Sequence, residues 1–236
     1  MGKDDDKLPD GGGCEAAVAA FLAEVARTPA PAPAGGRGRL IFAMDATASR
    51  EPTWDRAAKI QGEMFAATAS LGGLDVQLVF YRGFGECKAS PWVSSGEALV
   101  RRMSAVFCLA GQTQIAKVLR HALAETKRRK VNALVFVGDC MEESIDELAQ
   151  LAGELGLQGV RCFIFHEGRD PIAARAFKDI ARLSHGAYCA FDGASAQQLK
   201  DLLSAVAVYA AGGCKALADF GRERGGLPLQ LTQQLR

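Results

Sequence analysis

Short apolar runs alternate with longer segments of helical periodicity along most of this chain, and this alternation restricts its fold more than any other feature. Five short, mainly apolar runs are predicted as strands, namely 39–45, 75–81, 132–138, 160–166 and 187–191. Strands that alternate with helices imply right-handed crossovers and a mostly parallel sheet. Their near-continuous apolar character is typical of strands buried on both faces. We therefore expect an α/β fold with a doubly wound sheet and helices on both faces.

The segments between the strands carry apolar residues at helical spacing. Two of these stripes are Ala57, Ile60, Met64 and Leu71, and Leu99, Met103, Val106 and Phe107; the others are Ile115, Val118, Leu119, Ala122 and Leu123, then Ile172, Ala176, Phe177, Ile180 and Leu183, and last Leu199, Leu202, Leu203 and Val206. A sixth, weaker strand at 86–93 contains Pro91, which cannot donate a ladder hydrogen bond. We place this strand at an antiparallel edge, which makes the predicted sheet six-stranded.

The loop after the first strand is rich in oxygen atoms. Asp45-Ala46-Thr47-Ala48-Ser49 presents one carboxylate and two hydroxyls at every second position, directly after an apolar run. Hard divalent cations such as Mg²⁺ prefer oxygen ligands and keep several waters, so this grouping suits them. Two later strand-to-helix loops can complete such a site, one around Thr113 and the other at Gly138-Asp139.

The topology of a doubly wound sheet places these loops together. Ligands bind beyond the carboxyl ends of the strands, at the point where the strand order reverses. In the order 3-2-1-4-5-6, that point lies between the strand ending at Asp45 and the strand before Asp139. The topology and the motif therefore predict the same place for the site.

With these residues the sequence resembles the von Willebrand factor A (vWA) family, whose metal-ion-dependent adhesion site (MIDAS) consists of D-x-[ST]-x-S, a later Thr and a later Asp. The resemblance covers roughly residues 38–211. Matched to the motif, the metal ligands are Asp45, Thr47, Ser49, Thr113 and Asp139. Thr47 replaces the commoner Ser, and Cys140 stands where the family often has Gly.

The resemblance implies a Rossmann-like fold and a non-enzymatic function. A Mg²⁺ ion, or alternatively Mn²⁺ or Ca²⁺, would bridge the domain to a protein partner that presents an Asp or Glu side chain. No positioned base or nucleophile is evident near the motif, and the chain has no G-x-x-x-x-G-K-[ST], G-x-S-x-G or H-E-x-x-H. These observations favour a binding module over an enzyme.

Three other interpretations remain open. Asp45, Thr47 and Ser49 could simply cap a helix N-terminus. A haloacid-dehalogenase-like phosphotransferase would use Asp45 as its nucleophile, Gly138-Asp139 as its metal loop and Lys117 as its phosphate ligand. Against it, position 47 holds Thr rather than a second Asp. Lastly, the domain could be a vWA scaffold that has lost its metal dependence.

The composition favours a globular protein and argues against a nucleic-acid-binding or membrane-spanning one. With 236 residues and 49% hydrophobic residues, the chain can bury a substantial core. Its formal net charge of +1 argues against nucleic acid or an anionic membrane as partner, and no apolar stretch approaches the length of a membrane span. Seven scattered cysteines without a C-x-x-C pair and a polar, acidic N-terminus predict a reducing, cytoplasmic location.

Four regions are predicted along the chain. Residues 1–13 are expected to be disordered, and residues 14–37 to form a helix and a Pro/Ala/Gly linker. The vWA-like domain then spans 38–211, and 212–236 form a C-terminal extension. Within the domain we expect His166 to be a solvent-facing loop residue. We also expect Glu142 and Glu143 to complement the dipole of the helix that follows them.

Overall fold

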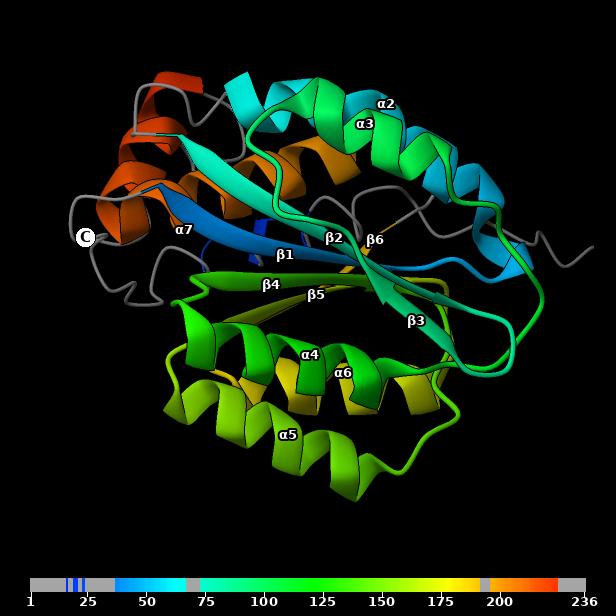
Figure 1. The fold of residues 1–236 in the computed structure, drawn as a ribbon. Coiled ribbons are helices and arrows are strands. Elements are labelled where there is room, and N and C mark those ends of the chain that lie inside the picture. The colour runs from blue at the N-terminus through cyan, green and yellow to red at the C-terminus, as the bar shows by residue number, and fades with distance from the viewer. Residues whose placement is uncertain are drawn as a thin grey trace, which may run out of the picture.

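The computed structural model describes residues 16, 19–20, 23, 37–66, 73–191 and 196–224, and in them the predicted α/β fold is confirmed. The six strands are β1 (Gly38–Asp45), β2 (Leu74–Arg82), β3 (Glu86–Ala89), β4 (Ala133–Gly138), β5 (Arg161–Glu167) and β6 (Ala187–Phe191). They form one sheet in the order β3-β2-β1-β4-β5-β6 (Figure 1). Every neighbouring pair is parallel except β2 and β3, so the antiparallel edge strand is also confirmed.

The edge strand is shorter than the predicted run 86–93. Its ladder ends at Ala89, and Val93 then makes an isolated bridge to Val76. Pro91, which has no backbone N–H to donate, lies in the interruption. The proline therefore explains both the edge position and the early end of the strand.

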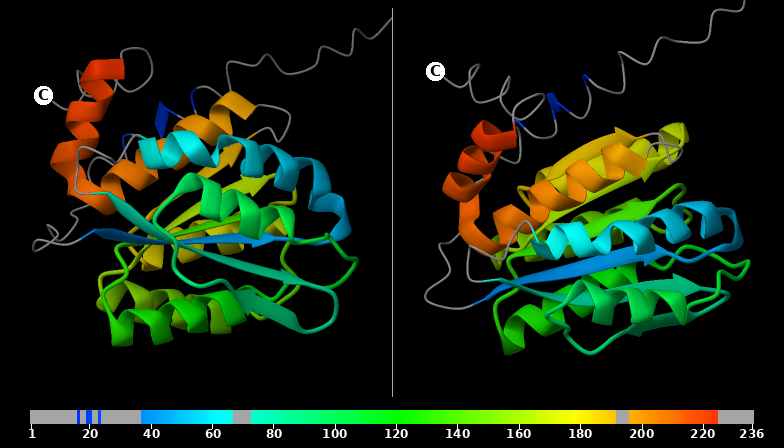
Figure 2. Two further views of the ribbon diagram at one scale, coloured as in Figure 1. Left: turned by 45° about the horizontal axis from the view of Figure 1, so that its top comes forward. Right: turned by 90° about the horizontal axis from the view of Figure 1, so that it is seen from above.

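Helices cover the two faces of the sheet in separate groups, as Figures 1 and 2 show. One face carries α2 (Glu51–Ala66), α3 (Gly96–Ser104) and α7 (Ala196–Arg224), and the other carries α4 (Ile115–Arg128), α5 (Ile145–Leu157) and α6 (Pro171–Leu183). Strand β1 contributes to both cores because its side chains alternate. Leu40, Phe42 and Met44 belong to the first core, whereas Ile41 and Ala43 belong to the second.

Helix α3 is shorter than the apolar stripe in the sequence predicts. The apolar stripe runs on to Phe107, but α3 ends at Ser104, and Phe107 is 74% exposed in the loop that follows. This loop turns away so that the Leu109 N–H can reach the carbonyl of Ala46, 3.0 Å away. A long-range backbone contact thus overrides the local periodicity.

The chain ends of the domain are only partly described. Helix α7 bends at Gly213, whose positive φ of 73° suits glycine, two residues after the predicted domain boundary at 211. The segment predicted as disordered (1–13), most of 14–37 and the side chains of Ile60 and Leu71 lie outside the described residues. None of the helices in the described part combines the length and the apolar character needed to cross a bilayer.

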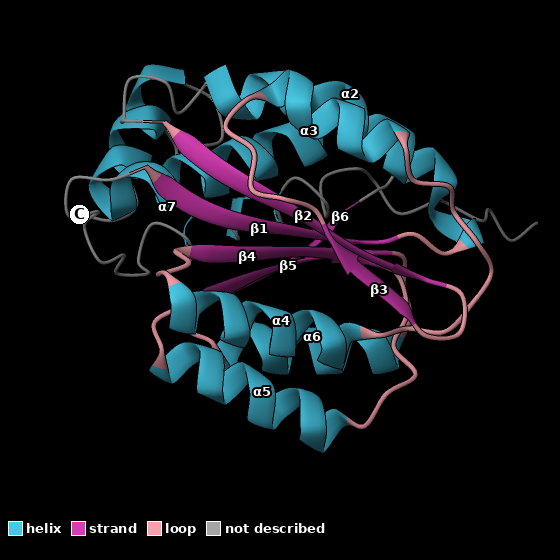
Figure 3. Cartoon of the chain, in the orientation of Figure 1, coloured by secondary structure: helices cyan, strands magenta, loops and turns pink. Residues whose placement is uncertain are grey.

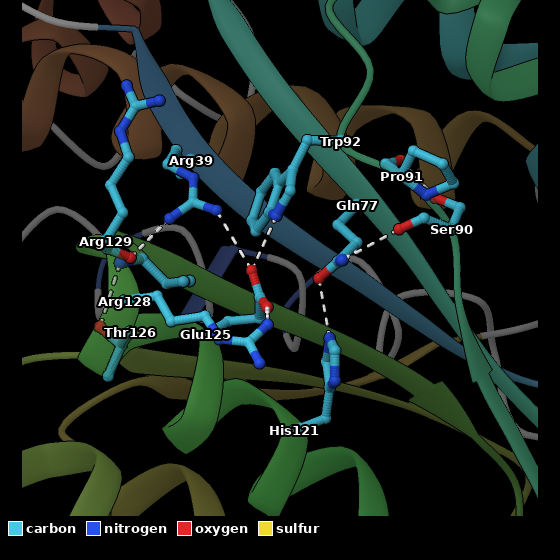
Figure 4. A network of polar contacts seen from close by, with 11 residues as sticks. Arg39, Gln77, Ser90, Pro91, Trp92, His121, Glu125, Thr126, Arg128 and Arg129 are labelled. Carbon is cyan, nitrogen blue, oxygen red and sulfur yellow. Dashed lines mark hydrogen bonds and ion pairs between the residues drawn. The ribbon is translucent and has the colours of Figure 1, made fainter.

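A buried polar network fastens α4 to the sheet at the end of β1 opposite Asp45 (Figure 4). The Arg39 guanidinium lies 3.7 Å from the centre of the Trp92 ring and 3.3 Å from the Glu125 carboxylate. The Trp92 indole N–H donates to the same carboxylate at 2.8 Å. Beside them, His121 and Gln77 share a 2.8 Å hydrogen bond.

Candidate metal centre

The two acidic residues of the predicted site lie at the carboxyl ends of neighbouring strands. Asp45 is the last residue of β1, and Asp139 directly follows Gly138, the last residue of β4. The two strands are parallel and adjacent, and the chain leaves them toward opposite sides of the sheet. This is the topological switch point of the fold, and Figure 3 shows the loops that leave this edge in pink.

Asp45 is completely buried, with 0% exposure. Its Oδ1 accepts a 2.7 Å hydrogen bond from the backbone N–H of Thr47, whereas its Oδ2 has no hydrogen-bond partner. Burial raises the pKa of Asp45, and the nearby charge of Asp139 adds to the increase. A buried carboxylate oxygen without a hydrogen-bond partner is costly, because it has lost its contact with water and gained none in return.

Hydroxyl groups connect Asp45 to Asp139. The Thr47 and Ser49 hydroxyls lie 3.4 Å apart, and Ser49 donates to Asp139 Oδ2 at 3.1 Å. The other oxygen of that carboxylate, Oδ1, is buried without a hydrogen-bond partner. The structure therefore brings four of the five predicted ligands into one polar cluster.

Thr113 lies on the loop before α4, at the same edge of the sheet. Its hydroxyl accepts a 3.0 Å hydrogen bond from the backbone N–H of Glu142, and its own N–H donates to the Glu142 carboxylate at 3.1 Å. Since Leu109 on this loop also bonds to Ala46, the loop is tied to both loops that carry the acids. Thr113 thus borders the cluster, and both of these hydrogen bonds connect it to Glu142.

Arg50 was missed by the sequence analysis. Its side chain is only 2% exposed, and its Nη2 lies 2.5 Å from the Glu167 carboxylate, while its Nη1 lies 3.9 Å from Asp139 Oδ2. Thr53 also donates to Glu167, at 2.6 Å. An arginine at a helix start normally faces solvent, and only the position of Glu167 at the end of β5 reveals why this one is buried.

The prediction for His166 is wrong. Its ring is buried, with 1% exposure, and hydrogen-bonds to the Tyr188 hydroxyl at 2.9 Å and to the backbone carbonyl of Asp139 at 3.2 Å. Burial lowers the pKa of His166. Because β5 lies next to β4, its last residues reach the Asp139 loop, and His166 helps to position that loop.

Glu143 complements a different helix from the one predicted. Its carboxylate accepts hydrogen bonds from the backbone N–H groups of Ile115 and Ala116, at 2.5 and 2.9 Å. These donors open α4, whereas Ser144 caps α5, the helix that follows in sequence. Glu143 therefore interacts with the dipole of α4 instead of the dipole of α5, and this contact connects the Thr113 loop to the Asp139 loop.

The cluster contains one sulfur atom. Ligand atoms of Asp45, Asp139 and Cys140 all lie within 4.8 Å of one another. Burial raises the pKa of the Cys140 thiol to about 12, and the charge of Asp139 contributes to the increase.

These residues fit a divalent cation better than a set of helix caps. Thr47 stands at the N-cap position of η1 (Ala48–Arg50), yet its side chain makes no capping hydrogen bond. The hydrogen bond from the Thr47 backbone N–H to Asp45 occupies only one of the two carboxylate oxygens. Two buried, unpaired carboxylate oxygens and neighbouring hydroxyls form a donor set that suits a hard cation.

The sheet order and this polar cluster define a doubly wound α/β protein with a group of carboxylates and hydroxyls at its switch point. No family model and no curated protein matches the sequence. Among solved structures, the VWA domain of SpRpn10 matches with a TM-score of 0.55 and 16% identity, over 71% of this chain and 94% of that one. The chain thus has the von Willebrand factor A fold.

Two further structures share this fold. Proximal thread matrix protein 1 from the mussel byssus, solved with a zinc-occupied MIDAS motif, gives a TM-score of 0.58 at 16% identity, over 73% of this chain and 46% of that one. The pilus adhesin SpaC from Lactobacillus rhamnosus GG gives a TM-score of 0.58 at 12% identity, and the match covers 80% of this chain and 31% of that one. The chain therefore spans less than half of either of these structures.

Proposed function

We propose that this protein is a protein-interaction module that binds its partner through a divalent cation. The ion is Mg²⁺, which Mn²⁺ or Ca²⁺ can replace, and the ligands are Asp45, Thr47, Ser49, Thr113 and Asp139. The partner contributes an Asp or Glu side chain, and we place this interaction in the cytoplasm.

The observation that carries this proposal is the pair of unpaired carboxylate oxygens, Asp45 Oδ2 and Asp139 Oδ1, buried at the switch point. A dication would compensate both charges and supply an exchangeable position for a carboxylate. Ser49 holds the Asp139 carboxylate in place, and the Thr113 hydroxyl keeps a lone pair beyond its bond to Glu142. These side chains do not fill the coordination sphere of the ion, so an acidic group from a partner can replace one of its waters.

The surface around the cluster favours a protein as partner. Five of the exposed large apolar residues in the described part of the chain lie on loops or helix starts at this edge: Phe84, Phe107, Leu109, Ile145 and Ile172. Several large apolar side chains exposed at one edge of a molecule are typical of a protein interaction site.

The phosphotransferase alternative finds less support. Its phosphate ligand would be Lys117, but the ammonium group binds the Gly85 carbonyl and the Gln114 side chain, both at 2.8 Å. The metal-independent alternative has one observation in its favour. The buried Arg50 guanidinium near Asp139 supplies a positive charge that could stand in part for a metal ion.

A peptide array tests the proposal. Peptides that carry a single Asp or Glu, and otherwise identical ones with Asn or Gln, are probed with the protein in Mg²⁺ or in chelator. We expect binding to acidic peptides in Mg²⁺ only, and its loss in Asp45→Ala. The control is Asp179→Ala, since Asp179 lies on the surface of α6 and pairs with Arg182. Binding that survives both chelation and Asp45→Ala would refute the metal bridge.

A further inference from the structure

Cys140 places a thiol inside the candidate metal centre. Its sulfur lies within 4.8 Å of the ligand oxygens of both Asp45 and Asp139, and its side chain is half-buried beside them. Neither carboxylate is saturated, because Asp45 Oδ2 and Asp139 Oδ1 have no hydrogen-bond partners, and Asp45 is fully buried. Three ligand groups of two types therefore lie close together: two carboxylates and a thiol.

We propose that Cys140 is a metal ligand, and that this centre binds Zn²⁺ in preference to Mg²⁺. This inference rests on the proposed metal-bridged function and revises one part of it, because it places Zn²⁺ ahead of Mg²⁺ as the preferred ion of the same centre. Thiolate is a soft ligand that Mg²⁺ does not favour, whereas Zn²⁺ combines readily with both sulfur and carboxylate oxygen. The residue that departs from the family pattern thus determines the choice of metal.

The geometry suits a tetrahedral ion. With metal–ligand bonds of about 2.0–2.3 Å, two ligands of one zinc ion lie about 3.5 Å apart. The spacing of at most 4.8 Å needs a side-chain adjustment of only about 1 Å for the three ligands to converge. As the Zn–S bond forms, the Cys140 thiol releases its proton to water.

Three protein ligands leave the fourth position of a tetrahedral zinc ion open. A partner carboxylate can occupy that position, as the proposed function requires. Ser49, which donates to Asp139 Oδ2, orients that carboxylate while its other oxygen binds the ion.

Cobalt(II) provides a direct test, because a cobalt–thiolate bond gives an intense charge-transfer band in the near ultraviolet. We expect this band when Co²⁺ is added to the reduced wild-type protein, and its loss in Cys140→Ser. The matched control is Cys108→Ser, which removes a half-buried thiol on the neighbouring loop that is not part of the ligand group. This control should keep the band.

Zinc affinity, measured by competition with a chromophoric chelator, should fall at least tenfold in Cys140→Ser and stay unchanged in Cys108→Ser. Circular dichroism and the urea denaturation curve in chelator should remain as in the wild type, which shows that the variant folds. If Cys140→Ser does not fold, Cys140→Ala takes its place. A retained band, no band in the wild type, or unchanged zinc affinity would each overturn the inference.

Asp45→Asn separates this inference from the proposed function. If only the role of Cys140 is wrong, Asp45→Asn loses both Zn²⁺ and Mg²⁺ binding, while Cys140→Ser behaves as the wild type. If the metal centre itself is wrong, Asp45→Asn binds both ions as the wild type does.

Discussion

At the scale of single residues, Arg50 connects the candidate metal centre to Glu167. Its guanidinium is buried and divides its charge between two carboxylates, with Glu167 at 2.5 Å and Asp139 at 3.9 Å. The closer ion pair, with Glu167, holds the Arg50 guanidinium away from Asp139. We therefore expect Glu167 to keep Asp139 available for the proposed metal ion, although Glu167 is not itself one of the predicted ligands.

This arrangement predicts the effect of Glu167→Gln. Without the Glu167 charge, Arg50 should turn toward Asp139 and compete with the cation for the carboxylate. We expect Mg²⁺ to bind about tenfold more weakly, a difference of about 1.4 kcal/mol, as measured by calorimetric titration. Asp179→Asn, which removes a surface acid on α6, serves as the control. Unchanged or tighter Mg²⁺ binding in Glu167→Gln would show that Glu167 does not restrain Arg50.

At the scale of elements, α4 contacts the sheet through the polar network at the end of β1 opposite the candidate metal centre. The Arg39 and Glu125 side chains are 7% and 9% exposed, and Trp92 bonds to the same carboxylate. Removing one member of a buried ion pair leaves the other charge without compensation. Glu125 also pairs with Arg128, whose side chain is 78% exposed. Its pairs with Arg39 and with Arg128 therefore allow a buried and an exposed ion pair to be compared in one protein.

Glu125→Ala should therefore lower the free energy of unfolding by about 3 kcal/mol, because Arg39 and Trp92 lose their shared acceptor. Arg128→Ala should change it by less than about 0.5 kcal/mol, because an exposed pair contributes little. Urea denaturation followed by circular dichroism measures both. Equal effects of the two substitutions would mean that Arg39 is stabilised by other contacts.

At the scale of the whole molecule, the fold follows from local patterns, whereas the details of the site do not. The alternation of apolar runs and helical stripes predicted the sheet and its edge strand, because each pattern reports which faces of an element are buried. Periodicity carries no information on which loops meet. The burial of His166 and Arg50 depends on residues that are distant in sequence, Tyr188 and Glu167.

The end of α3 illustrates the same limit. Val106 and Phe107 continue the helical spacing, yet the chain leaves the helix at Ser104 to bond with the β1 loop. The roles of the five predicted ligands remain predictions, although the structure places four of them in one polar cluster. The order of these residues along the chain predicted that they lie close together, because the carboxyl ends of parallel strands lie at one edge of the sheet.

Mg²⁺-dependent thermal stability tests the central claim most directly. An ion that binds only the folded protein stabilises it by about 2.7 kcal/mol at a concentration one hundred times its Kd. For a chain of this size, that raises the Tm by roughly 5–10 °C.

We expect this increase in wild-type protein and its absence in Asp45→Asn. In chelator, the variant should be at least as stable as the wild type, because it no longer buries an unpaired carboxylate oxygen. An equal Mg²⁺-induced rise in Tm in both proteins would contradict the account, as would no rise in the wild type.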